Sequence, residues 1–123
     1  MAENKVFVGE DGFIHNVYSG DQDYASVKAV EMEDRRFAQE LRAAGKPVLV
    51  VADLRQMGKS TPDSRKAARE ALDVGFFDRI AVTGGSAFLR HLSNFIITAS
   101  RHSDRARWVG TEEEAAEWLS GAR

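Results

Sequence analysis

The 123-residue chain has the length of one domain, and its 43% hydrophobic and 29% charged residues are typical of a folded protein rather than a disordered one. The formal net charge of −2 lacks the basic excess of a nucleic-acid-binding protein, and the absence of cysteine excludes disulfides and thiolate chemistry. No apolar run approaches the ~20 residues of a membrane-spanning helix. Because the first residues also lack a signal-peptide pattern, we expect a cytoplasmic protein without stable membrane insertion.

Two short β-prone runs, residues 6–8 and 13–18, open the chain and flank Gly9-Glu10-Asp11-Gly12. An Asp-Gly pair between such runs is a strong hairpin signal, because glycine readily adopts the positive φ of a tight turn. The spacing then predicts a helix from about residue 23 to 44, ended by Gly45. Glu31 and the other charged residues are expected away from its apolar face, which consists of Tyr24, Val27, Val30, Phe37, Leu41 and Ala44.

Residues 48–51 form an apolar run without alternation, as in a central strand covered on both faces. After Asp53 we expect a short polar loop that reaches Ser60. Thr61 and Pro62 suit the N-cap and first turn of the next helix, which the pattern extends to about residue 73.

Residues 80–83 predict another buried strand, closed by Gly84 and Gly85, and Ser86 suits the N-cap of the following helix. A last strand at residues 107–109 precedes a final helix with an acidic capping box. The order β-β-α-β-α-β-α-β-α predicts one α/β domain over residues 1–123. Its mixed sheet would combine an N-terminal antiparallel hairpin with parallel strands, packed with about four helices.

Gly58-Lys59-Ser60 resembles the end of a nucleotide-binding P-loop, but Asp53 stands where that motif requires its first glycine. A carboxylate there would repel phosphates, so we do not expect a nucleotide site. Thr83-Gly84-Gly85-Ser86 fits two interpretations, a tight turn with a serine cap or part of a ligand-binding edge.

The sequence contains no recognisable catalytic or metal-binding constellation. His91 and His102 are eleven residues apart, about 16 Å along one helix, and His15 has no acidic residue at a recognisable ligand spacing. No serine lies in a nucleophile-elbow motif. We therefore expect no metal, no cofactor and no enzymatic activity.

Three segments resemble the STAS fold of bacterial anti-sigma-factor antagonists, and more closely its small stand-alone SpoIIAA-like branch. They are residues 48–55 (VLVVADLR), residues 79–90 (RIAVTGGSAFLR) and residues 107–119 (RWVGTEEEAAEWL). In the antagonists, a partner kinase phosphorylates a serine at the start of the helix after the first buried parallel strand. The resemblance thus makes Ser64 a candidate phosphoacceptor, with Ser60 and Thr61 as alternatives by position, although the pair Asp63-Ser64 is displaced from the family spacing.

The resemblance implies a non-enzymatic binding or regulatory domain that acts through loops at the carboxyl ends of its parallel strands. We expect its partner edge to consist of Asp53, Lys59, Thr83, Gly84, Gly85 and Ser86. The alternative is a small apolar-ligand or lipid binder similar to CRAL-TRIO domains, with a pocket formed by Phe88, Leu92, Phe95 and Ile96. The expected partner is a protein or a small apolar ligand rather than a nucleic acid, and a homodimer is compatible with the sequence.

Overall fold

In the computed structural model, which describes residues 2–121, five strands form one sheet in the order β1-β2-β3-β4-β5. The first two, β1 (Lys5–Val8) and β2 (Ile14–Gln22), pair antiparallel. The next three, β3 (Leu49–Ser60), β4 (Arg79–Thr83) and β5 (Ala106–Val109), continue parallel to β2. The predicted mixed α/β fold is confirmed, while residues 1, 122 and 123 of the expected domain lie outside the described part.

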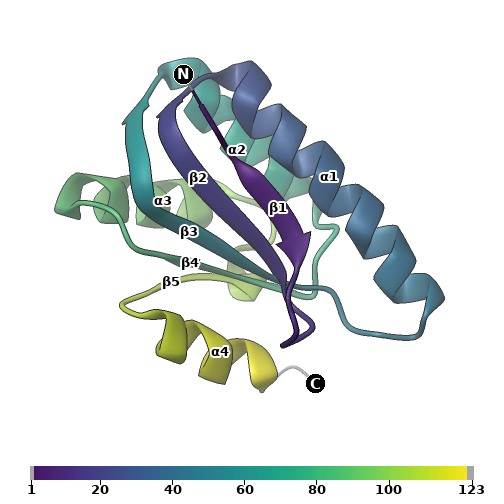
Figure 1. The fold of residues 1–123 in the computed structure, drawn as a ribbon. Helices are drawn as coiled ribbons and strands as arrows, with labels where there is room; N and C mark the ends of the chain where they lie inside the picture. Colours follow the sequence, from purple (N-terminus) through teal and green to yellow (C-terminus); the bar gives the residue numbers. More distant parts are fainter. Residues whose placement is uncertain (1, 122–123) are drawn as a thin grey trace.

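Four helices cover the two faces of this sheet (Figure 1). The three that connect the parallel strands are α1 (Tyr24–Ala43), α2 (Pro62–Val74) and α3 (Ala87–Ala99). They share one face, because successive right-handed crossovers to the adjacent strand place their helices on the same side. The last helix, α4 (Glu112–Ser120), follows the sheet and packs on the opposite face. No helix within residues 2–121 has both the length and the apolar character needed to cross a bilayer.

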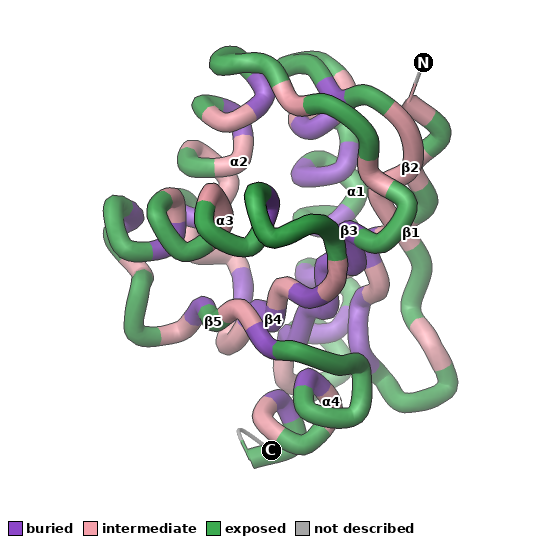
Figure 2. The backbone as a smooth tube through the Cα atoms, turned by 90° about the vertical axis from the view of Figure 1, so that its left-hand side faces the viewer, coloured by how far each residue is buried: buried purple, intermediate pink, exposed green. Residues whose placement is uncertain are grey.

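Two hydrophobic cores follow from this layering, and β3 contributes to both. Val50 packs with the three-helix face, whereas Leu49 and Val51 pack under α4, as the period of two along a strand requires. Figure 2 shows the buried residues concentrated in the central strands and on the inward sides of the helices. The prediction that this apolar run is covered on both faces is thus confirmed.

The helix starts form as predicted. Thr61, Ser86 and Thr111 each accept a hydrogen bond from the backbone N–H three residues later, at 3.0, 3.2 and 3.1 Å. Each bond satisfies one of the amide groups that a helix leaves free at its first turn. These local signals fix where the three helices begin.

The expected polar loop after Asp53 is wrong, because β3 continues as a strand to Ser60. Its second half pairs with the end of β2, where Gln22 lies opposite Ser60 after two register shifts. Asp21 accepts a hydrogen bond from the Lys59 backbone N–H at 2.8 Å and lies where a Cβ at position 58 would project. Gly58 therefore allows close contact between two strands rather than a turn.

The expected apolar face of α3 is rotated from the actual one. Leu89 and Ile97 are its buried residues, whereas Phe88 and Phe95 are 63% and 73% exposed. The cause lies in the preceding turn, where Gly84 and Gly85 have φ of 83° and 86°. Leu89 packs so closely on Gly85 that a Cβ there would lie 3.0 Å from its Cδ1 atom, and this contact fixes the rotation of the helix.

The inward stripe of α1 includes two acidic residues. Glu31 and Asp34 are 2% and 3% exposed, within a stripe that also contains Val27, Val30, Ala38 and Leu41. The prediction that Glu31 lies away from the packed face is therefore wrong. Glu31 follows Val27 by one helical turn and therefore lies on the same face of the helix. Only its charge suggested that it would be exposed to solvent.

Candidate functional site

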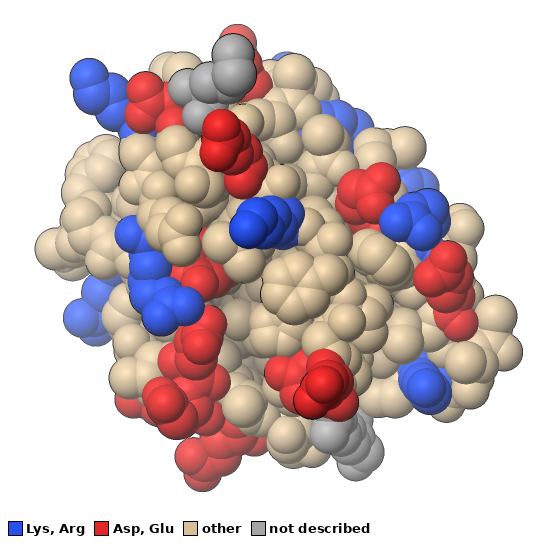
Figure 3. Space-filling model, viewed as in Figure 1, with Lys and Arg blue, Asp and Glu red and all other residues tan. Residues whose placement is uncertain are grey.

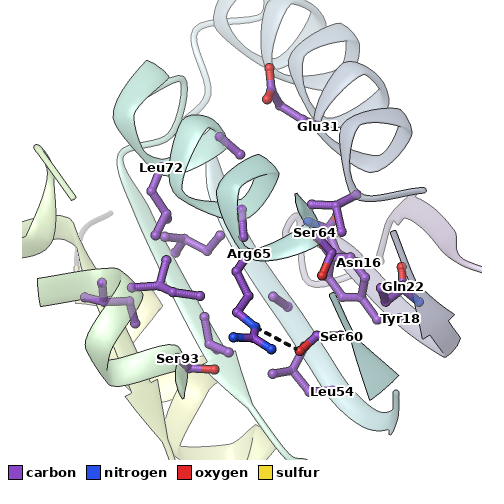
Figure 4. A pocket seen from close by; sticks show the side chains of 18 of the residues that line it. Asn16, Tyr18, Gln22, Glu31, Leu54, Ser60, Ser64, Arg65, Leu72 and Ser93 are labelled. Atoms are coloured by element: carbon purple, nitrogen blue, oxygen red, sulfur yellow. Dashed lines mark hydrogen bonds between the residues drawn. The ribbon is translucent and has the colours of Figure 1, made fainter. Parts of the chain in front are cut away.

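A cavity of about 130 Å³ lies between the sheet and the three helices α1, α2 and α3 (Figure 4). Its volume is close to the ~150 Å³ of an engineered apolar cavity that binds benzene. Most of its wall is apolar and comes from β3, β4, α2 and α3, including Ala52, Leu54, Ala68, Ala71, Leu72, Val82, Leu89, Leu92 and Ile96.

Polar side chains from β2 and α1 also line this cavity. Ile14, Asn16 and Tyr18 alternate along β2, so all three point to the side of the sheet that α1 covers. Asp34 on α1 approaches Asn16, whose Nδ2 atom donates a hydrogen bond of 2.7 Å to Asp34 Oδ2. This buried amide–carboxyl pair joins the first parallel strand to the longest helix.

The amide oxygen of Asn16 and the second carboxyl oxygen of Asp34 have no hydrogen bond within the described residues. Asn16 Oδ1 and Asp34 Oδ1 are both inaccessible to bulk solvent and unpaired within the described residues. Asn16 Oδ1 is an acceptor, and Asp34 Oδ1 is an acceptor when the carboxyl is ionised; an unsatisfied buried acceptor costs about 1–3 kcal/mol. Both residues are among those that line the cavity.

The two buried acidic residues of the cavity, Glu31 and Asp34, differ in whether a basic side chain neutralises them. Glu31 forms ion pairs with Lys28 at 3.2 Å and Arg35 at 3.4 Å, whose side chains lie toward solvent. Asp34 forms no ion pair within residues 2–121. Burial raises the pKa of Asp34 to about 7, the hydrogen bond from Asn16 opposes this shift, and the nearby Glu31 adds to it. Burial and the same two acids also raise the pKa of Tyr18 above its ordinary value, so its hydroxyl stays neutral.

The candidate phosphoacceptors lie at the end of β3 and the start of α2. Ser64 is only 2% exposed; its hydroxyl donates to the Thr61 carbonyl and accepts from the Thr61 N–H, at 2.8 and 2.9 Å. Thr61 is exposed, and Ser60 is half-buried beside Arg65, whose Nε lies 3.4 Å from Ser60 Oγ. Figure 4 shows Ser60 beside Arg65, and Ser64 next to Asn16. The fold thus uses Ser64 to cap a helix.

Asp53 lies on the opposite face of the sheet. Arg55 binds its carboxylate through the backbone N–H at 2.9 Å and the guanidinium group at 2.8–3.1 Å, and it also reaches Glu112 of α4 at 3.0 Å. Burial raises the pKa of Asp53, but the hydrogen bonds from Arg55 outweigh that effect and leave it below its ordinary value. Acidic and basic side chains are mixed over this side of the molecule (Figure 3).

The other residues of the expected edge also serve the fold. Thr83 is buried and lies beside Asp53 in the sheet, and Lys59 is exposed near the far end of β3. Gly84 passes so close to Arg55 that a Cβ would lie 3.0 Å from its backbone nitrogen, and Ser86 caps α3. Asp53, Thr83 and Gly84 thus lie close together, whereas Lys59 lies further along β3 and Ser64 lies on the other face of the sheet.

Half of the expected apolar pocket contributes to the cavity. Leu92 and Ile96 line it, whereas the exposed Phe88 and Phe95 lie outside. The side of α3 that faces the cavity is therefore rotated from the predicted apolar stripe and includes Leu89 and Ser93.

A solved structure has the same architecture. The match is a crystal structure of an uncharacterised DUF3478-family protein with a SpoIIAA-like fold from Shewanella loihica PV-4. It covers 96% of this chain and 93% of that chain, with a TM-score of 0.60 and 12% sequence identity. The fold is SpoIIAA-like. No family model matches the sequence, and no curated protein matches it either.

The polar end of the cavity contains two oxygen atoms without a partner in the described residues, Asn16 Oδ1 and Asp34 Oδ1. Within residues 2–121, no group of three or more His, Asp or Glu side chains is arranged to hold a metal ion. Sequence reasoning missed Asn16 and Asp34. The signal was present in the helical spacing of Asp34 with Val27, Val30 and Ala38, and in the alternation of Ile14, Asn16 and Tyr18.

Proposed function

We propose that this SpoIIAA-like domain is a non-enzymatic binding domain that takes a small, largely apolar ligand into the cavity beneath α1, α2 and α3. The supporting observation is the combination of apolar walls with two buried, unpaired acceptors at one end. Binding sites for small molecules usually have this character, with mostly apolar lining and a few polar groups that set orientation.

The dimensions of the cavity restrict the ligand. About 130 Å³ accommodates a molecule of one ring or a short chain, which is far smaller than a membrane lipid with two acyl chains. Of the ligands considered for the CRAL-TRIO-like alternative, the cavity volume therefore favours a small molecule over a lipid. In a regulatory domain, such a ligand would act through α1, α2 and α3, because residues of all three helices line the cavity.

Binding to a protein through the strand ends has less support. Asp53 is held by Arg55, and Ser64 caps α2, so neither side chain is free for a partner in this arrangement. The two residues also lie on opposite faces of the sheet. A ligand in the cavity uses groups that the fold leaves unsatisfied, whereas the strand edge offers groups that the fold already uses.

The test is a titration with toluene, followed in ¹⁵N–¹H NMR spectra of the wild-type protein and two variants. Ala71→Leu adds three carbon atoms to the cavity wall, and Ala29→Leu makes the same change at an exposed position of α1. We expect saturable shifts at cavity residues in the wild type and in Ala29→Leu, and their loss in Ala71→Leu. Equal binding to both variants, or no saturable shift in any protein, would overturn the proposal.

A further inference from the structure

The polar end of the cavity presents acceptors to a ligand. Within residues 2–121, Asn16 Oδ1 and Asp34 Oδ1 are buried oxygens without a partner, and one N–H of the Asn16 amide donates to Asp34 Oδ2. When Asp34 is ionised, a ligand that carried only acceptors would leave both oxygens unsatisfied. A ligand with hydrogen-bond donors satisfies them, so the missing partner is a donor.

The charges of the cavity indicate the type of donor. Glu31 is neutralised by two basic side chains, Lys28 and Arg35. Asp34 has no basic partner in the part of the chain that the structure describes, although it is 3% exposed. A buried carboxylate requires either a proton or a cation, because an isolated charge in an apolar environment is strongly unfavourable.

The cavity has one basic side chain in its own lining. Arg65 comes from α2, and its Nε lies 3.4 Å from Ser60 Oγ. It forms no ion pair with Asp34. The carboxylate end is therefore left for a ligand.

We infer that the ligand carries a cationic amine head, which binds Asp34 and Asn16 while its apolar body lies against α2 and α3. An alkylammonium group has three N–H donors, enough for Asp34 Oδ1, Asn16 Oδ1 and one further acceptor such as the Tyr18 hydroxyl. The amine pairs with the ionised carboxylate of Asp34, so at a pH below about 7 its binding releases the proton that this carboxyl otherwise holds. The inference rests on the proposed cavity function and adds the ligand class to it.

Four probes with one aromatic ring test this inference: benzylamine, benzyl alcohol, toluene and phenylacetate. At pH 8 we expect benzylamine to bind most tightly. Asp34→Asn should weaken benzylamine about 10- to 100-fold, because a hydrogen bond to a charged group is worth about 1.5–3 kcal/mol. Glu40→Gln makes the same acid-to-amide change at an exposed position of α1 and should leave benzylamine binding unchanged.

The outcomes separate this inference from the proposed function. Toluene binding to Asp34→Asn verifies that the variant keeps an intact cavity. Three results would overturn the amine inference while the cavity function stands, provided that toluene binds. Benzyl alcohol could bind as tightly as benzylamine, or Asp34→Asn could bind benzylamine as tightly as the wild type. The third result is that phenylacetate binds most tightly of the four probes, through Arg65. If no probe binds, both are overturned.

Discussion

Replacing Asp34 by asparagine should change how the stability of the protein depends on pH. The substitution keeps the size of the side chain and removes its titration. Asn16 and Tyr18 face this carboxyl from β2, Glu31 and Glu33 act on it from α1, and Arg65 lines the same cavity. Because burial dominates over these neighbours, the pKa of Asp34 is raised from 3.8 to about 7 in the folded protein.

The sign follows from proton binding. The folded state binds a proton more tightly than the unfolded state, so the protonated carboxyl stabilises the protein fully below about pH 4. That stabilisation is lost as the pH rises to about 7, at about 1.4 kcal/mol per pH unit and about 4 kcal/mol in total. The Asp34→Asn variant does not lose this stability as the pH rises, because its amide does not titrate. The free energy of unfolding of the variant, minus that of the wild type, should therefore increase by about 2–3 kcal/mol between pH 5 and pH 7 and then level off.

Urea denaturation of both proteins at half-unit steps from pH 5 to pH 8.5 measures this difference. Other titrating groups affect wild type and variant alike, so they cancel in the comparison. Glu40→Gln, on the same helix but exposed, provides the control and should differ from the wild type by a nearly constant amount. A difference for Asp34→Asn that does not vary with pH, or that decreases as the pH rises, would refute the reasoning.

Two further substitutions test the structural roles of predicted site residues. Ser64→Glu should destabilise the protein by several kcal/mol, because it introduces a carboxylate at a 2% exposed position and removes a capping hydroxyl, whereas Ser60→Glu should cost about 1 kcal/mol or less. Equal urea midpoints for these two variants would contradict the placement of Ser64. Gly84→Ala should lose about 1–3 kcal/mol, because alanine is strained at φ 83° and its Cβ would contact the Arg55 backbone. A thermal unfolding midpoint equal to that of the wild type would show that this close contact does not exist.

The elements of this fold follow largely from local signals. The Asp11-Gly12 turn, the caps at Thr61 and Ser86, and the apolar run before Asp53 each depend on residues adjacent in sequence, and each forms as expected. Such features need no knowledge of what packs against them.

The site depends on how α1 and α3 are rotated against the elements on which they pack. Charge suggested that Glu31 lies in solvent, yet its burial depends on Lys28 and Arg35 reaching it from the exposed side of the same helix. The position of Phe88 outside the cavity follows from the packing of Leu89 on Gly85. Neither effect can be read from hydrophobic periodicity, because both depend on how a helix is rotated against its neighbours.

The pKa of Asp34, measured by NMR from its ¹³C-labelled carboxyl group with and without saturating benzylamine, tests the central claim most directly. The cavity and its unpaired acceptors predict a pKa of about 7 in the free protein. An amine that binds the ionised form should lower it by about one pH unit or more, which corresponds to a tenfold preference for the carboxylate. A free pKa near 4, or the same value with and without benzylamine, would contradict the claim that this buried carboxyl is the ligand-binding group of the cavity.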